Sequence, residues 1–505
     1  MAAFQKLLDS YIAPEGFELE SLIATTYQVD FEFFEEELLA TALGIRTPSS
    51  RVRVFRTEIE RSLRKKSVTV LYDLRGSPTA KRSSPQIDPL PIQGRKLHAK
   101  ITLLMWVRLA QGAGERAVRR VRLVLGSANL TRAGFRENYE CVVTLDFGDS
   151  NSPRRSVLQD AIKFIGSIGA GGNSPTLARQ LGEFQAFAAT VPANSQAKNQ
   201  PIDFVSADTA MQILRKEWDA LDGARPNSVT VVSPFWPEGS TAAQAMKRVV
   251  ETLAGPKRLD LVCQGVLSPN GADWVPEFDP VLAVQLRPLI NGQLFLRPTL
   301  PDAGVDEEDN DKGDETETEE IGRALPDNDP AISEASRALH AKMIFVDGDK
   351  GSVIYVGSSN CTRRGLRLGG TTNWEAGFIY RLSRSGRNQL QRLLDMAGKA
   401  VEVLPDKAPL SVAPVREPDE PVPDFLSEIV ATRTTVNIRF QGKSSIPQDL
   451  IILMPIPARL EDAGYWLLYP QGNSKVRGTQ LNVVLGHAPR CDELRKAMSP
   501  LPEDQ

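Results

Sequence analysis

Leu97-His98-Ala99-Lys100 occurs a second time in this chain, as Leu339-His340-Ala341-Lys342. Two further strings follow each copy in the same order: Gly-Ser-x-Asn at 126–129 and 357–360, then Asn-x-Glu at 138–140 and 373–375. The chain contains three histidines, and two of them lie in these copies. The shared order of the strings therefore indicates an internal duplication rather than two unrelated histidines.

The segments around these strings repeat as well. Each half is expected to contain strand, helix, strand, His-x-Lys strand, strand, turn and strand, in a repeat of roughly 190–200 residues. The expected strands are 21–29, 67–73, 98–109, 121–125 and 141–145, then 228–233, 258–263, 293–297, 340–347, 353–356 and 376–382. The expected helices are 31–43, 153–194, 206–221, 240–253 and one near 389–403. Asp30 is placed to cap the first helix and Gly44 to end it.

Composition divides the chain into four parts. We expect a first lobe with connecting helices at 1–200, a second lobe at 201–403, a Pro-rich linker at 404–423 and a β-rich accessory domain at 424–505. The second lobe contains an acidic insert at 302–329, with 13 acidic and two basic residues, which we expect to be flexible. The insert carries a net charge of −11, so the rest of the chain carries +8 of the total of −3. A basic body fits a polyanionic substrate.

Composition also narrows the class of protein. The 41% of hydrophobic residues is ordinary for a soluble protein, and no apolar run reaches the ~18–20 residues of a membrane span. The four cysteines are far apart and form no Cys-x-x-Cys, which argues against a zinc site or a disulfide framework. No secretory signal is visible at the N-terminus. We therefore expect a cytoplasmic protein without a metal site or a bound cofactor.

The repeated strings suit phosphate chemistry. A histidine and a lysine two residues apart on a strand project from the same face. An ammonium group repels a metal cation but binds phosphate oxygens, while the imidazole beside it can act as nucleophile or proton donor. The Gly-Ser-x-Asn turn adds neutral donors, and a glutamate can hold the second ring nitrogen of each histidine. Two such sets facing each other would permit covalent catalysis at phosphorus.

This pattern resembles the phospholipase D superfamily, whose signature is His-x-Lys-x4-Asp followed by Gly-Ser-x-Asn. The second copy matches in full, at His340, Lys342, Asp347, Gly357, Ser358 and Asn360. The first copy has Met105 where the aspartate belongs, as tyrosyl-DNA phosphodiesterases of the superfamily also lack it. The resemblance covers about residues 20–403 and leaves the C-terminal part unmatched. It implies an α/β fold of two duplicated lobes, each a mixed β-sheet flanked by helices, with the site at their interface.

The resemblance also assigns roles. His98 corresponds to the nucleophile and His340 to the general acid and base, which leaves the opposite assignment as the alternative. Lys100, Lys342, Asn129 and Asn360 would bind phosphate, and Glu140 and Glu375 would orient the histidines. Ser127 and Ser358 either donate to phosphate or only shape the turn. Arg132 and Arg363 either contact the substrate or are solvated residues at a capped helix start. Trp236 is expected to pack between the lobes, with base stacking as the alternative.

The function implied by this resemblance is a metal-independent phosphodiesterase, and we expect a nuclease acting through a phosphohistidine. A basic loop at 74–95 precedes His98, so we expect nucleic acid as the partner, DNA rather than RNA, and a place in restriction or phage defence. The alternatives are a lipid-directed phospholipase D or transphosphatidylase, and a non-catalytic nucleic-acid-binding subunit. A membrane partner is not expected, whereas a homo-oligomer or a partner subunit is.

Overall fold

The computed structural model divides into two compact units, residues 1–416 and 417–505. In the first unit it describes residues 7–404, apart from 48, 50, 78–83, 111–116, 150–151, 171–173, 194–200, 222–223, 237–241, 254, 268–273, 300–337, 368–371, 383–385 and 389–397. In the second unit it describes five strands, 426–431, 435–440, 452–455, 465–468 and 480–484. The acidic insert and residues 405–423 of the Pro-rich linker lie outside the described residues.

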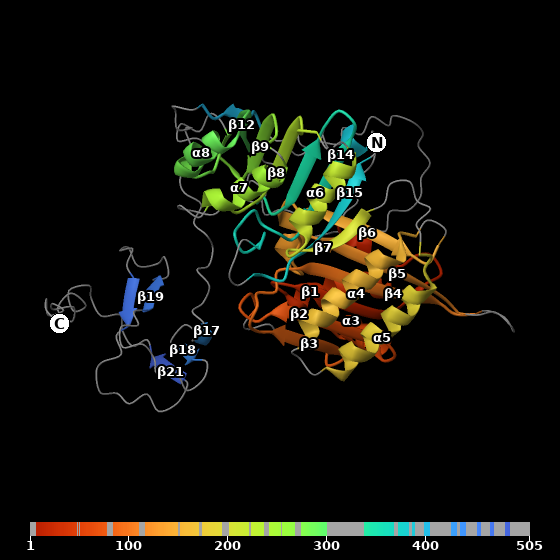
Figure 1. Ribbon diagram of the computed structural model, residues 1–505. Coiled ribbons are helices and arrows are strands. Elements are labelled where there is room, and N and C mark those ends of the chain that lie inside the picture. Colours follow the sequence, from red (N-terminus) through yellow and green to blue (C-terminus); the bar gives the residue numbers. More distant parts are fainter. Residues whose placement is uncertain are drawn as a thin grey trace, which may run out of the picture. The chain divides into compact units, whose positions relative to one another are not determined.

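The first lobe is built on a six-stranded mixed sheet, shown in red and orange in Figure 1. Its strands are β1 (Glu18–Thr26), β2 (Ser67–Asp73), β3 (Ile87–Ile92), β4 (Lys100–Arg108), β5 (Val118–Gly126) and β6 (Val142–Phe147). They lie in the order β3-β2-β1-β4-β5-β6. The first three pair in parallel, and β4 reverses the direction against both β1 and β5. The predicted order of the His-x-Lys strand and its two successors, as neighbours in one sheet, is confirmed.

The second lobe repeats this topology strand for strand. Its strands are β8 (Ser228–Val232), β9 (Arg258–Cys263), β12 (Gln293–Pro298), β13 (Met343–Asp347), β14 (Ser352–Gly357) and β15 (Ala376–Leu382). The order β12-β9-β8-β13-β14-β15 has the same parallel and antiparallel pairings as the first sheet. Two edge strands extend it, β16 (Val401–Glu402) beside β12 and β7 (Pro201–Ser206) beside β15. The predicted fold of two duplicated α/β lobes is confirmed.

Helices cover both faces of the first sheet. On one face, α4 (Arg155–Gly169) and α5 (Pro175–Thr190) pack side chains such as Ile165 and Phe184 against alternate sheet residues. On the other face lie α1 (Phe31–Phe33), the π-helix η2 (Phe34–Leu39), α2 (Ala40–Leu43) and α3 (Val52–Leu63). The alternation of side chains along each strand provides both apolar faces.

The helix expected at 31–43 begins and ends where the sequence indicates. Asp30 accepts a hydrogen bond from the Phe33 amide at 3.2 Å, which caps the first turn. Gly44 ends it in the left-handed region, with φ of 68°. In the second lobe, α6 (Ala210–Leu221), α7 (Ala242–Thr252) and α8 (Pro280–Leu286) cover one face of the sheet around a core that includes Trp218. None of the helices within the described ranges is long and apolar enough to cross a membrane.

Two local predictions are corrected. The segment 74–95 was expected to be a mobile loop, but residues 87–92 form the edge strand β3. Pro89 and Pro91 hid this strand from a reading of the sequence, because proline is tolerated at a sheet edge but rare inside a sheet. The helix expected near 389–403 is contradicted at its end, where residues 401–402 pair with β12 as β16; residues 389–397 lie outside the described part.

The second unit contains two small antiparallel sheets. One has the order β17 (Leu426–Ala431), β18 (Thr435–Phe440) and β21 (Gln480–Val484). The other pairs β19 (Ile452–Pro455) with β20 (Tyr465–Leu468). Four of these strands contain β-branched residues, and β20 begins with two aromatic residues, which also favour strands.

Candidate active site at the junction of the lobes

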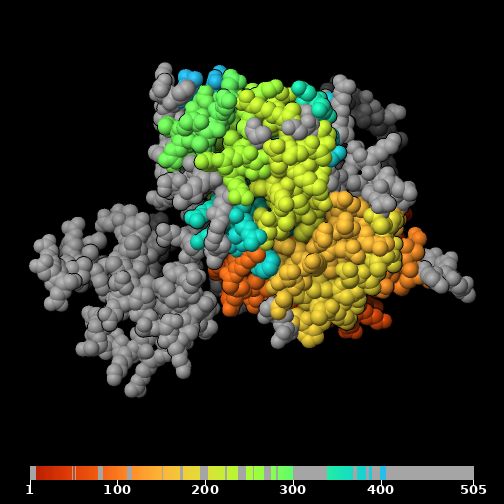
Figure 2. All heavy atoms as spheres, viewed as in Figure 1, coloured from red at the N-terminus to blue at the C-terminus, as the bar shows by residue number. Residues whose placement is uncertain are grey.

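Each histidine segment pairs with the Asn-x-Glu segment of the other lobe. Leu97 forms a parallel bridge with Trp374, in which the His98 amide donates to the Trp374 carbonyl at 3.0 Å. Tyr139 forms the matching bridge with Leu339, and the His340 amide donates to the Tyr139 carbonyl at 2.9 Å. Figure 2 shows the same junction, with cyan atoms of the second lobe against orange atoms of the first. The lobes are therefore joined by backbone hydrogen bonds at the histidines themselves.

Arg95 strengthens one side of this junction. Its guanidinium donates to the carbonyls of Thr372 at 2.9 Å and Asn373 at 2.7 Å, and it stacks 4.2 Å from the centre of the Trp374 ring. A guanidinium that is both stacked and hydrogen-bonded holds its partner segment in one orientation. Nothing in the sequence predicts this role of Arg95, because its partners Thr372 and Asn373 are 277 and 278 residues away.

The glutamates are exchanged between the lobes. His98 Nδ1 lies 2.9 Å from Glu375 Oε2, and His340 Nδ1 lies 2.6 Å from Glu140 Oε1. Both carboxylates are almost fully buried, with side-chain exposures of 0% and 1%. A carboxylate at Nδ1 favours a proton on that nitrogen, which leaves the Nε2 lone pair of a neutral imidazole available for chemistry. Each histidine is thus oriented by the lobe that does not carry it.

The two serines of the Gly-Ser-x-Asn turns hold these glutamates. Ser127 donates to Glu140, and Ser358 donates to Glu375 at 2.5 Å. Each hydroxyl also accepts a backbone amide, from Cys141 at 2.9 Å and from Ala376 at 3.1 Å respectively. Both serines are fully buried, so their hydroxyls position a carboxylate rather than present a donor to a ligand.

Both lysines lie directly under the histidines. Lys100 Nζ donates to the His98 carbonyl at 2.7 Å, and Lys342 Nζ donates to the His340 carbonyl at 2.5 Å. Burial, the largest cause, lowers the pKa of Lys342 to about 8, and together with the neighbouring Lys342 charge it lowers the pKa of Lys100 as well. Two buried ammonium groups that are close enough to repel each other favour the binding of an anion.

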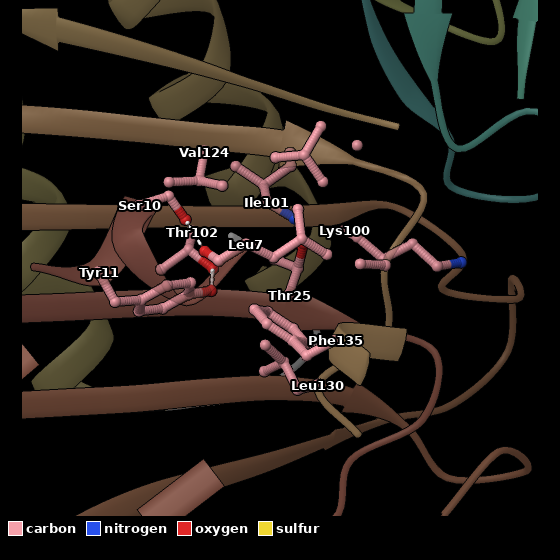
Figure 3. A pocket seen from close by; sticks show the side chains of 13 residues that line it. Leu7, Ser10, Tyr11, Thr25, Lys100, Ile101, Thr102, Val124, Leu130 and Phe135 are labelled. Atoms are coloured by element: carbon pink, nitrogen blue, oxygen red, sulfur yellow. Dashed lines mark hydrogen bonds between the residues drawn. The ribbon is translucent and has the colours of Figure 1, made fainter. Parts of the chain in front are cut away.

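A small cavity of about 20 Å³ lies behind Lys100, enough for one water molecule. It is lined by Tyr11, Thr102 and Phe135, and the Tyr11 hydroxyl bonds Thr102 Oγ1 at 2.8 Å. Figure 3 shows the Lys100 ammonium pointing away from the other lining side chains. The aliphatic part of the Lys100 side chain therefore lines the cavity, whereas its ammonium group lies at the His98 carbonyl.

The histidines are held neutral in this site. Burial is the main cause that lowers the pKa of His98 to about 3 and that of His340 to about 4, and Lys100 and Lys342 lower both further. The partner carboxylates oppose the shift, and interaction with the histidines keeps the pKa of Glu140 and Glu375 below the ordinary value. Because each lysine influences the histidine of the other lobe, the two His-x-Lys pairs share one electrostatic environment.

The asparagines complete the turn on each side. Asn129 Oδ1 accepts a long hydrogen bond, 3.4 Å, from the Gln28 amide. Asn360 Oδ1 is buried and has no partner among the described residues. A buried, unpaired amide oxygen is costly, and a ligand or water would relieve that cost.

A glycine follows each Gly-Ser-x-Asn turn at the same distance, Gly134 in the first lobe and Gly365 in the second, and neither was predicted as a site residue. A Cβ at Gly134 would lie 2.5 Å from the Asn129 carbonyl oxygen, and one at Gly365 would lie 2.4 Å from that of Asn360. The Gly134 amide donates a hydrogen bond to Thr131 Oγ1, and the Gly365 amide donates one to Thr362 Oγ1, both at 3.1 Å. An alignment of the two halves would have revealed both glycines, because Thr-Arg-x-Gly occurs in residues 126–135 and again in residues 357–366.

Three predicted positions lie outside the cluster. Arg132 forms an ion pair with Glu37 at 3.2 Å and is half exposed, and Arg363 is exposed just beyond the second turn. Trp236 does not pack between the lobes: it is 3% exposed inside the core of the second lobe, with its ring centroid 5.2 Å from that of Phe278. The expectation for Trp236 was wrong because it occupies the position equivalent to Val29, a core residue of the first lobe.

Asp347 has a structural environment at the far end of β13 from Lys342. It accepts hydrogen bonds from Ser352 Oγ at 2.5 Å and from Arg387 Nη2 at 2.6 Å. Its counterpart, Met105, lies at 1% exposure in the core of the first lobe. The missing aspartate of the first copy is thus replaced by apolar packing away from the histidines.

Replacement of Asp347 by asparagine should destabilise the protein without changing its catalysis. The free energy of unfolding in urea should fall by about 1–3 kcal/mol, because Arg387 and Ser352 lose a charged partner. The turnover number should stay at the wild-type value. Asp349→Asn, at an exposed acid two residues further on, is the control and should unfold like wild type. A loss of turnover in Asp347→Asn alone would contradict the structural role.

Acid should destabilise the fold from about pH 6.5 downward. The unfolded chain protonates His98 and His340 near their ordinary pKa of 6.5, whereas the folded chain protonates them only at about 3 and 4. The unfolded state therefore binds more protons between these values, so stability falls as the pH falls through 6.5 towards 4. Melting temperatures measured from pH 7.5 to 5 should show this slope, and a His98→Gln/His340→Gln double variant should show a flatter one. Equal slopes would mean that the imidazoles are not held neutral.

Comparisons with known proteins find similarity only at a low level. No protein family and no curated protein matches the sequence. Among solved structures, a yeast tyrosyl-DNA phosphodiesterase aligns at 11% identity over 74% of this chain and 86% of its own, with a TM-score of 0.41. A phosphatidylserine synthase from Haemophilus influenzae Rd KW20 aligns at 12% identity over 77% and 88%, with a TM-score of 0.38. A polyphosphate kinase from Porphyromonas gingivalis aligns at 14% identity over 80% of this chain, which spans 50% of that enzyme, with a TM-score of 0.37.

The deciding observation is the junction itself, where two lobes of one topology bring together both His-x-Lys pairs and both Gly-Ser-x-Asn turns. The two duplicated α/β lobes have the arrangement that the resemblance to the phospholipase D superfamily implies. Six of the eight residues predicted as catalytic lie together at the lobe junction: His98, His340, Lys100, Lys342, Glu140 and Glu375. Asn129 and Asn360 lie two residues after the serines that hold the two glutamates.

Proposed function

We propose that this chain is a phosphodiesterase that hydrolyses nucleic acid through a phosphohistidine intermediate. The observation that carries the proposal is the pair of neutral imidazoles, each held by a carboxylate at Nδ1, above two buried ammonium groups. A phosphodiester anion placed there would neutralise the lysine charges that now repel each other. It would also raise the histidine pKa values, which the two lysines lower.

In the first step, Nε2 of His98 attacks phosphorus and forms an N–P bond. The bond from phosphorus to the leaving oxygen breaks, and that oxygen takes a proton from Nε2 of a protonated His340. Lys100, Lys342 and the side-chain amides of the two asparagines stabilise the charge on the non-bridging oxygens. Glu375 stabilises the positive charge that develops on the His98 ring as its lone pair is used.

In the second step, the now neutral His340 takes a proton from water, and the resulting hydroxide attacks phosphorus. The N–P bond breaks, its electron pair returns to His98, and His340 is again protonated for the next cycle. Glu140 stabilises the imidazolium form of His340 before the first step and after the second. Every proton and charge in this cycle is held by residues of the chain.

Nucleic acid is the substrate class that the surroundings of His98 favour. Arg75, Arg95 and Lys96 lie on the segments that lead to His98, and the aromatic ring of Tyr27 lies beside it. The Trp374 ring stacks on Arg95. Cations with aromatic rings suit the phosphates and bases of a strand. The +8 charge outside the acidic insert points the same way, and we propose DNA rather than RNA as the preferred strand.

The test is cleavage of end-labelled single- and double-stranded DNA and RNA in excess EDTA, with phosphatidylcholine micelles as a parallel substrate. Wild type should cleave a DNA strand in EDTA, and His98→Ala and His340→Ala should not. Cleavage of phosphatidylcholine alone would replace the nuclease with a lipid-directed enzyme of the same chemistry. Cleavage that disappears in EDTA, or that survives loss of both histidines, would overturn the two-histidine mechanism.

A further inference from the structure

The pseudo-twofold site is chemically unequal beside its two histidines. Tyr27 follows β1, and its ring centroid lies 5.8 Å from that of His98 at an interplanar angle of 53°. Lys96, two residues before His98, places its ammonium 4.3 Å from the centre of the Tyr27 ring. Both side chains are half-buried, so each retains a surface that a ligand can reach.

The strand registers identify the equivalent positions in the second lobe. Thr25 pairs with Ile101, as Val232 pairs with Met343, and these partners directly follow the two lysines. Tyr27 therefore corresponds to Pro234, and Lys96 to Ala338. The loops otherwise match: Thr26 Oγ1 donates to the Gln28 carbonyl at 2.7 Å, and Ser233 Oγ donates to the Phe235 carbonyl at 2.8 Å. The same backbone thus carries an aromatic ring and a cation in one lobe and neither in the other.

The Tyr27 ring is held at a defined place. The Thr26 hydroxyl also accepts the Leu130 amide at 3.2 Å, which anchors the loop to the Gly-Ser-x-Asn turn. On its other side, a Cβ at Gly76 would lie 2.3 Å from the Tyr27 carbonyl oxygen and 3.1 Å from ring carbon Cε2. Only glycine leaves room for the ring at that contact, so the loop after β2 is shaped around Tyr27.

We propose that Tyr27 and Lys96 form a subsite for one nucleoside of a single strand, on the His98 side of the scissile phosphate only. The ring stacks on the nucleobase, and the ammonium moves from the ring to the adjacent phosphate. Because Pro234 and Ala338 offer neither contact, the strand binds in one direction across a site whose catalytic groups are otherwise symmetric. This inference rests on the proposed nuclease function.

The experiment uses short single-stranded DNA with one cleavable phosphodiester between methylphosphonate linkages. One substrate lacks the base on the 5′ side of that bond, and another lacks it on the 3′ side. For wild type, loss of the base on one side should raise KM by about 5-fold or more, the equivalent of about 1 kcal/mol of stacking, while loss on the other side should not. Tyr27→Leu should raise KM for the intact strand and remove the difference between the two substrates.

Two variants separate stacking from a general effect on the fold. Tyr27→Phe keeps the ring and should keep the difference between the two abasic substrates. Lys96→Gln should keep that difference but weaken the dependence of KM on salt, because one phosphate contact is lost. Equal KM values for the two abasic substrates in wild type, or an undiminished difference in Tyr27→Leu, would overturn the subsite and leave the nuclease standing. Failure of wild type to bind or cleave any strand would overturn both.

Discussion

Replacing His340 by asparagine should convert the enzyme into one that stops after its first step. With thymidine 5′-p-nitrophenyl phosphate, the leaving group departs without a general acid, so His98 can still form the N–P bond. Without a base to activate water, the phosphohistidine should persist. We expect a burst of one p-nitrophenol per enzyme, followed by turnover slowed by about 10²–10⁴-fold.

His98→Asn is the matched control. It should show no burst and lose turnover by about 10⁴-fold or more, because the covalent route is closed. An acid-labile, base-stable label on the protein, retained in His340→Asn and absent in His98→Asn, would identify the adduct directly. If the burst and the label occur in His98→Asn instead, the nucleophile is His340 and the roles are reversed.

Glu375→Gln and Glu140→Gln should each slow the step of the histidine in the opposite lobe. Glu375 contacts His98, so its replacement should slow the burst by about 10–100-fold, the usual loss when the group that orients a catalytic imidazole is neutralised. Glu140 contacts His340, so its replacement should leave the burst intact and slow the steady state by about the same factor. Stopped-flow absorbance of p-nitrophenol separates the two phases.

Glu137→Gln serves as the control, since it removes an exposed carboxylate three residues from Glu140. Both phases should match wild type. If Glu375→Gln slowed only the steady state and Glu140→Gln only the burst, each glutamate would act on the histidine of its own lobe. That result would contradict the exchange between lobes.

The duplication and the chemistry of the site are determined locally. A histidine two residues before a lysine and an aspartate placed to cap a helix act within one strand or one turn. The strands therefore fall where alternation and β-branching predict them, and Asp30 and Gly44 bound their helix as predicted. The edge strand β3 was not predicted, because its prolines are rare inside a sheet and so suppress the sequence signal of a strand. Its pairing with β2 nevertheless holds the segment in the sheet.

Contacts between the lobes were decided only by the tertiary structure. The sequence determined that glutamates would orient the histidines, but Glu375 and Glu140 are close to the histidines of the other lobe only after the lobes have docked. The burial of Trp236 likewise depends on the core residues of the second lobe that pack against it. The stacking of Arg95 on Trp374 depends on the segment of the other lobe that lies beside Arg95. Pairings between residues 200 and 277 positions apart leave no periodicity in the sequence. Periodicity reports which face of its own strand or helix a residue occupies, and not what packs against that face.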